Sequence, residues 1–180
     1  MKKILFIFLT ACFFFSCEKE TIVIPQQHAG RTVLAFFWAD NSLNSNLRNK
    51  IRTMMQGLQA MKDSAALLVY WDGEASDISW PEPCIVEYVT NGQGGINSMS
   101  KEAVNAMIAD QDMSVHDLIS IGNIRKKYSP QTSTEKTVMQ TVIGDMMSVY
   151  PSESYGIIFG SHGSGWLPTI TGTSSIGQDG

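Results

Sequence analysis

Short, nearly unbroken apolar runs recur along this chain, and they alternate with longer segments in which apolar residues return every three or four positions. The runs cover residues 31–39, 65–71, 84–89 and 154–160. Runs of this length, rich in β-branched and aromatic residues, are typical of strands that are buried on both faces of a sheet. The pattern therefore predicts four buried strands.

The three- and four-residue spacing predicts amphipathic helices between the strands. These helices are expected over residues 43–61, 100–109, from 114 onwards, and over 134–150. Ser114 and Asp117 have the spacing of an approximate capping box, and Pro151 ends the last helix. We interpret the Arg-Lys-Lys run at 125–127 as the cationic end of a helix.

The first two strands and the helix between them form a βαβ unit, whose right-handed crossover makes a parallel pair the default. With 180 residues, 43% of them apolar, the chain is long enough for one domain with a core. We therefore expect an α/β domain with a mainly parallel sheet flanked by helices. Asp40 and Asp72 end the first two strands and would project near one edge, although helix capping and turn formation explain them equally well.

The first sixteen residues form a separate segment. Lys2 and Lys3 precede the apolar stretch 4–15, which is too short to span a bilayer permanently and reads as an export signal. Cleavage before Cys17 uses the whole apolar run and leaves the small Ser16 at the −1 position. Cys17 is therefore the predicted lipidated residue, and Cys12 is the alternative.

The residues after Cys17 carry a second signal. Glu18-Lys19-Glu20 resembles the acidic signal that sends Bacteroides-type lipoproteins to the cell surface. The predicted location is thus the cell envelope, with a lipid anchor in the outer membrane and exposure at the surface. An ordinary secreted signal peptide with an incidental cysteine is the less favoured alternative.

Charge and cysteine content limit the function classes. Removal of residues 1–16 leaves eleven basic residues against seventeen acidic ones, and a chain this acidic without a larger basic cluster argues against nucleic acid as a partner. Cys84 is the single cysteine left in the folded part, so it cannot form an internal disulfide. It starts its strand, which we take to be the wrong end for a site at the carboxyl edge, and we interpret it as a small buried residue.

The last strand runs into a histidine flanked by glycines. His162 follows the strand, and Gly160, Gly163 and Gly165 allow a close approach of the backbone. Ligands of α/β sheets gather at the carboxyl ends of strands, and an imidazole titrates near neutral pH. This segment is therefore the candidate active site.

The segments Ser154-Tyr155-Gly156 and 161–168, Ser-His-Gly-Ser-Gly-Trp-Leu-Pro, resemble the catalytic-histidine region of the clostripain family of cysteine peptidases, particularly its lipoprotein members in gut Bacteroides-type bacteria. The resemblance implies a caspase-like fold and a Cys-His dyad in which His162 is the general base. The N–H of Gly163 would supply part of the oxyanion site. Peptides or proteins would be the substrate, cleaved after basic residues, in some members with calcium dependence and with no cofactor that the chemistry requires.

The nucleophilic cysteine of the family follows the next strand in an Asp-Ala-Cys context, which these residues lack. The ending Gly177-Gln178-Asp179-Gly180 resembles a segment after which family members continue. We therefore expect an N-terminal portion whose cysteine lies beyond Gly180. The predicted organisation is a signal peptide at 1–16, a tether at 17–30 and a partial peptidase domain, incomplete at its C-terminus, at 31–180.

Two other functions stay open. An inactive surface lipoprotein on a degenerate peptidase fold would bind peptides or partner proteins without turnover. An α/β-hydrolase would use His162-Gly163-Ser164-Gly165 as its oxyanion turn, but the Gly-x-Ser-x-Gly elbow that carries its nucleophile does not occur in these residues.

Overall fold

The computed structural model describes residues 29–40, 43–61, 65–73 and 82–161. Within these ranges, five strands form one mixed sheet in the order β4-β3-β2-β1-β5. The strands are β1 (Ala29–Ala39), β2 (Ala65–Gly73), β3 (Cys84–Val89), β4 (Asn123–Lys127) and β5 (Ser152–Gly160). β1 runs parallel to both β2 and β5, whereas β3 is antiparallel to β2 and to β4. The α/β class and the parallel pair of the βαβ unit are confirmed.

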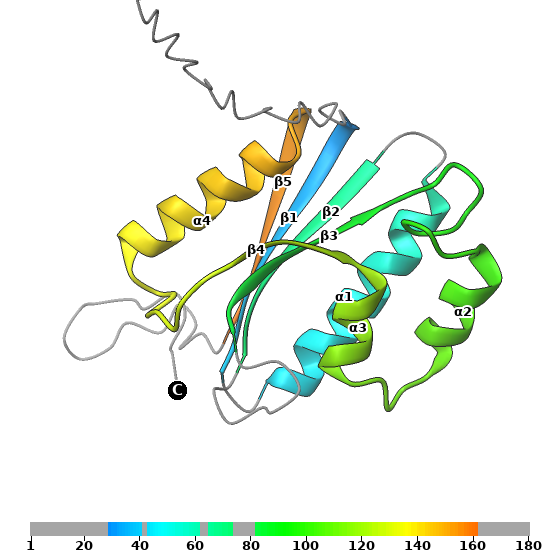
Figure 1. Cartoon of the computed structure of the whole chain (residues 1–180), viewed down its shortest axis with the longest axis horizontal. Helices are drawn as coiled ribbons and strands as arrows, with labels where there is room; N and C mark the ends of the chain where they lie inside the picture. The colour runs from blue at the N-terminus through cyan, green and yellow to red at the C-terminus, as the bar shows by residue number, and fades with distance from the viewer. Residues whose placement is uncertain (1–28, 41–42, 62–64, 74–81, 162–180) are drawn as a thin grey trace, which may run out of the picture.

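Helices cover both faces of the sheet (Figure 1). They are α1 (Asn44–Ala60), α2 (Lys101–Ala109), α3 (Val115–Ile121) and α4 (Lys136–Val149). α1, α2 and α3 lie on one face and α4 lies on the other. Each predicted helix is present to within two residues at its N-terminus. None of the helices in these ranges is long and apolar enough to cross a membrane.

The two-faced cover explains why β1, β2 and β3 read as unbroken apolar runs, whereas the prediction of a buried strand is wrong for β5, whose side chains are mostly exposed. Side chains of β1 alternate, so that Phe37 packs into the α1 side of the sheet while Phe36 and Trp38 pack into the α4 side. All three side chains are at most 1% exposed. Because neither face of β2 or of residues 34–39 of β1 meets water, no polar residue is needed at alternate positions.

The capping box predicted for the third helix is present. Ser114 Oγ accepts a hydrogen bond from the backbone N–H of Asp117 at 3.1 Å, and Asp117 Oδ2 accepts one from the N–H of Ser114 at 3.1 Å. The Ser114 hydroxyl also donates to Asp117 Oδ2 at 2.6 Å, and this bond, followed by the one from the Ser114 backbone N–H, lowers the pKa of the Asp117 carboxyl. Both exposed donors at the start of α3 are thereby satisfied.

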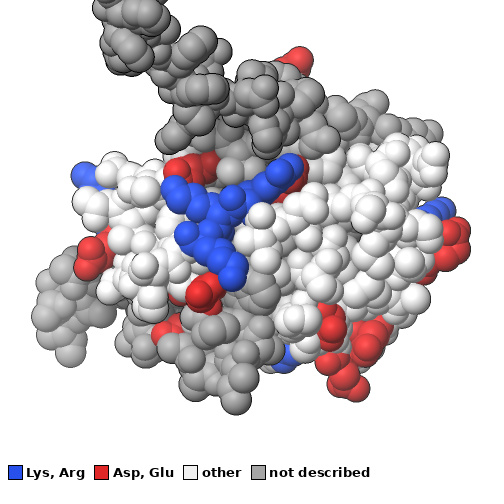
Figure 2. Space-filling model, viewed as in Figure 1, with Lys and Arg blue, Asp and Glu red and all other residues white. Residues whose placement is uncertain are grey.

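The interpretation of residues 125–127 as a helix end is wrong, because they belong to strand β4. Each basic side chain pairs with an acidic one on another segment. Arg125 contacts Glu87, Lys126 contacts Asp145 at 2.5 Å, and Lys127 contacts Glu82 at 2.8 Å. The basic patch is visible with acidic atoms at its margins (Figure 2). Charged side chains suit β4 because it is an exposed edge strand in the part of the chain that is described.

Cys84 does not lie at the opposite edge of the sheet from the predicted site, so that expectation is also wrong. The expectation required β3 to be parallel to its neighbour, but β3 is antiparallel to β2, and Cys84 pairs with Trp71 near the carboxyl end of β2. The connection 74–83 is shorter than the dozen or more residues that a parallel crossover needs. The Cys84 side chain has no exposed surface and lies in the core on the α1 side, so its interpretation as a buried residue is confirmed.

Candidate active site

Three parallel strands end side by side at the carboxyl edge of the sheet. Gly160 of β5 pairs with Phe37 of β1, and Trp38 of β1 pairs with Asp72 of β2. Ser161 follows Gly160 and is the last residue of this segment that the structure describes. The predicted site residues His162 and Gly163 lie outside the described residues, as do Cys17 and Cys12. Their assignments stay predictions.

Gly160 has a steric reason to be glycine. A Cβ atom at this position would lie 2.7 Å from Leu47 Cδ2 and 2.7 Å from Phe37 Cδ1. β5 therefore ends in close contact with α1 and β1. A larger residue would displace the strand end that leads directly into His162.

Aromatic rings pack along this edge on the α4 side. Phe159 stacks on Trp38 with ring centroids 5.7 Å apart, and Phe36 lies 4.5 Å from Tyr70. Aromatic pairs at such separations stabilise a fixed arrangement of the strands that carry them. The ends of β5, β1 and β2 are thus held in register by side chains as well as by the ladder.

A polar cluster joins the end of β2 to the segment between β4 and α4, residues 128–135, which we call the β4–α4 loop. Ser133 Oγ donates a hydrogen bond to Asp72 Oδ2. The Tyr70 hydroxyl lies 2.7 Å from Ser133 Oγ, and Gln131 Nε2 donates to the Tyr70 hydroxyl at 3.0 Å. Of these residues the sequence pointed only to Asp72, because the contacts join positions about sixty residues apart.

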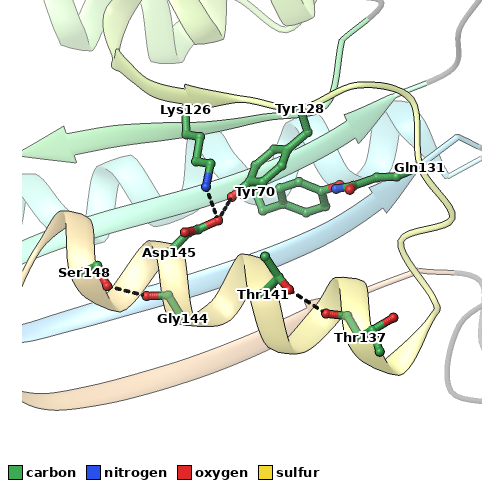
Figure 3. Close-up of polar contacts among 9 residues, drawn as sticks. All are labelled: Tyr70, Lys126, Tyr128, Gln131, Thr137, Thr141, Gly144, Asp145 and Ser148. Carbon is green, nitrogen blue, oxygen red and sulfur yellow. Dashed lines mark hydrogen bonds and ion pairs between the residues drawn. The ribbon is translucent and has the colours of Figure 1, made fainter.

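A second cluster ties the same loop to α4. Tyr128 donates to Asp145 Oδ2 at 2.8 Å, Lys126 donates to the same oxygen, and the Tyr128 ring meets the Tyr70 ring edge-on at 5.7 Å (Figure 3). Burial opposes the charge of Asp145, but the bonds from Lys126 and Tyr128 prevail and lower the pKa of its carboxyl. Burial, followed by the bond to Asp145, raises the pKa of Tyr128. Tyr128 therefore stays a neutral donor at physiological pH.

Within the ranges that the structure describes, no group of three or more His, Cys, Asp or Glu side chains is placed to hold a metal ion. The calcium dependence that the family resemblance implies stays a prediction. The two clusters provide the carboxylates of Asp72 and Asp145 and the neutral hydrogen-bonding groups of Tyr70, Tyr128, Gln131 and Ser133.

The profile of the clostripain family matches residues 35–180. The chain belongs to this family. No curated protein matches the sequence significantly. Among solved structures, a B. fragilis cysteine protease is similar with a TM-score of 0.54 and 26% identity, over 80% of this chain and 98% of that one.

Two further solved structures are from Bacteroides thetaiotaomicron. A secreted C11 cysteine protease in complex with an irreversible peptide inhibitor has a TM-score of 0.55 and 25% identity, over 84% of this chain but 34% of its own. A clostripain in complex with the peptide inhibitor BTN-VLTK-AOMK has a TM-score of 0.54 and 18% identity, over 80% of this chain and 99% of that one, and it supports the fold alone.

These comparisons confirm the family and the caspase-like α/β architecture that the sequence predicted. The chain has the fold of a clostripain-family cysteine protease. A protein or peptide is accordingly the class of substrate.

Proposed function

We propose that this chain is the N-terminal part of a cell-envelope cysteine endopeptidase in which His162 is the general base for a cysteine beyond Gly180. The place where β5 ends supports this proposal most directly. The pairing of Gly160 with Phe37 brings the strand end that precedes His162 to the carboxyl edge, where α/β sheets bind ligands. Cys84 is a poor nucleophile by comparison, because its thiol is completely buried.

The proposed reaction follows the general chemistry of a Cys-His pair. The imidazole of His162 takes the thiol proton, and the thiolate attacks the carbonyl carbon of the scissile peptide bond. Backbone donors, the N–H of Gly163 among them, stabilise the oxyanion that forms. The imidazolium then protonates the leaving amine, and water hydrolyses the acyl-enzyme to release the second product and the free thiol.

Cleavage after basic residues is part of the proposal. It is supported by membership of the clostripain family, for which the resemblance of the His162 segment implies cleavage after basic residues. Peptides with lysine or arginine before the scissile bond should therefore be cleaved faster than matched peptides with a neutral residue there.

The test is a comparison of His162→Ala with the wild-type protein, each purified from the native source as the whole polypeptide. Loss of a general base is expected to lower kcat by a factor on the order of 10² to 10⁴. His116→Ala is the matched control, because His116 is an exposed residue of α3. Full activity of His162→Ala would overturn the proposal, and peptide binding without cleavage by the wild-type protein would favour the inactive lipoprotein instead.

The envelope location belongs to the same proposal and rests on the residues around Cys17. A fatty-acid analogue fed to the cells should label the wild-type protein and Cys12→Ala, whereas Cys17→Ala should lose both the label and its membrane association. The reverse pattern would move the anchor to Cys12, and an unlabelled wild-type protein would refute lipidation.

A chelator that abolishes activity, with recovery on adding Ca²⁺, would support the calcium dependence.

A further inference from the structure

Hydrogen-bond direction in the polar cluster at the end of β2 can be read from its chemistry. A serine hydroxyl has one proton, and Ser133 gives it to Asp72. Ser133 must then accept from Tyr70, whose own oxygen accepts from the amide of Gln131. The cluster is therefore a one-way chain of donors that runs from Gln131 inward to the carboxylate of Asp72.

The inner part of this chain is rigid. Tyr70 and Ser133 have no exposed surface and Asp72 is 8% exposed, so the groups have little freedom to exchange partners with water. Tyr70 is held on a central strand and against the ring of Tyr128. The Tyr70 hydroxyl that accepts the hydrogen bond from Gln131 is thus held in place before any ligand arrives.

Gln131 keeps unused hydrogen-bonding capacity. Its Nε2 donates one N–H to the Tyr70 hydroxyl, and the described residues provide no partner for its second N–H or for its Oε1. The side chain is half-buried, with its amide directed at the Tyr70 hydroxyl (Figure 3). One donor and one acceptor on a neutral planar group match the carbonyl and N–H of a peptide main chain.

The strand that anchors Gln131 lies two strands away from β5, the strand that precedes the proposed active site. Its anchor Tyr70 pairs with Phe36, and Phe36 pairs with Phe159 near the end of β5. Two strand spacings amount to about 10 Å. An extended chain covers that distance in about three residues.

We propose that Gln131 binds a main-chain amide of the peptide substrate, about three residues from the scissile bond, and that Tyr70, Ser133 and Asp72 position it. This inference rests on the proposed peptidase function. Because the bond is to the main chain, it contributes to the binding of peptides whatever their side chains are.

The first test compares Gln131→Met with wild type in the whole native protein, with Thr132→Ala, an exposed neighbour on the same loop, as the control. Loss of the bond should raise KM for peptides about three- to tenfold while kcat stays within about twofold. The rate of inactivation by methyl methanethiosulfonate, a thiol reagent without an amide, should not change. An unchanged KM, or an equal change in Thr132→Ala, would overturn the proposal.

The second test separates binding from a structural role. Tyr70→Phe removes the anchor of Gln131 but leaves the bond from Ser133 to Asp72, so it should raise KM, and the double variant with Gln131→Met should be no worse than the poorer single variant. In a series of peptides that each carry a methyl group on one main-chain nitrogen, one should bind wild type more weakly than the unmethylated peptide does. The same methylation should leave binding to Gln131→Met unchanged. Additive effects, or equal methylation effects in both proteins, would contradict the proposal.

The same peptides distinguish this inference from the function on which it rests. If the wild-type protein binds peptides without cleaving them, the dissociation constants measured by fluorescence anisotropy replace KM, and Gln131→Met should weaken binding by the same factor. In that case the peptidase proposal fails and the binding site stands. A wild-type protein that neither cleaves nor binds peptides would refute both.

Discussion

Glu87 lies on β3, and its carboxylate is buried in the interior of the protein. Its side chain has no exposed surface, and its Oε2 contacts Arg125, whose side chain is 34% exposed. Oε1 is buried without a hydrogen-bond partner among the described residues. A buried charge of this kind depends on its single cationic partner, because removing that partner leaves the desolvation cost uncompensated.

Arg125→Met should therefore destabilise the protein by about 3 kcal/mol. The double variant Glu87→Leu with Arg125→Met should recover most of that loss, since it removes the buried charge as well. Lys127→Met, which disrupts a pair exposed on both sides, should show no measurable change. Urea unfolding gives all three free energies, and an Arg125→Met variant as stable as Lys127→Met would contradict this account.

The charge of Asp145 should make stability depend on pH. Because the folded protein lowers the pKa of this carboxyl, the charged form stabilises the fold above the unfolded pKa of about 3.9, and the contribution disappears as pH decreases through the folded pKa. Asp145→Asn should be less stable than wild type at pH 7 and equally stable near pH 2. Asp112→Asn, at an exposed position outside the cluster, is the control. A pH-independent difference for Asp145→Asn would show that its charge is irrelevant.

At the scale of elements, Gly122 and Gly144 should respond in opposite ways to substitution by alanine, although each follows an isoleucine. Gly144 lies inside α4, and a Cβ there would meet no atom within 4 Å apart from its chain neighbours and the backbone of its own helix, whereas a Cβ on Gly122 would lie 2.2 Å from Val86 Cγ1 and 3.1 Å from the carbonyl oxygen of Glu87. Gly144→Ala should stabilise the protein by about 0.5–1 kcal/mol through helix propensity. Gly122→Ala should destabilise it by about 1–3 kcal/mol through overpacking. Thermal unfolding of both variants checks the signs, and a shift in the same direction would be inconsistent with this packing.

Strand β5 exposes apolar side chains on both faces. Ile157, Ile158 and Phe159 are each more than 40% exposed, and within the described residues β5 pairs with β1 alone. Apolar edges of this kind associate. A piece comprising residues 17–180 should therefore scatter light as an aggregate, and Ile157→Lys should reduce the scattering. A monomeric wild-type piece with one sharp thermal transition would refute this expectation.

The sequence predicts those helices and strands whose burial produces a regular pattern of apolar residues along the chain. β1 and β2 are buried on both faces and leave unbroken apolar runs, and α1 has one buried stripe that repeats every three or four residues. β4 was missed because all its residues are exposed and its ion partners, Glu87 and Asp145, are distant in sequence. The direction of β3 could have been predicted from the short 74–83 connection.

At the scale of the whole molecule, the sequence predicts where the site lies better than what surrounds it. The local strand pattern and the glycines placed His162 after a strand end, and the structure places that strand end at the same carboxyl edge of the sheet as Asp72, with β1 between them. The chain from Gln131 through Ser133 to Asp72 joins two distant segments, and no local pattern encodes such a contact. Only the folded sheet brings these groups together.

The central claim is that His162 activates a cysteine other than Cys84. The most direct measurement is mass-spectrometric mapping of the residue that a lysine-containing peptide acyloxymethyl ketone modifies in the whole native protein. We predict one modified cysteine outside residues 1–180, and a loss of modification in His162→Ala. Modification of Cys84, or equal modification of the His162→Ala protein, would contradict the account.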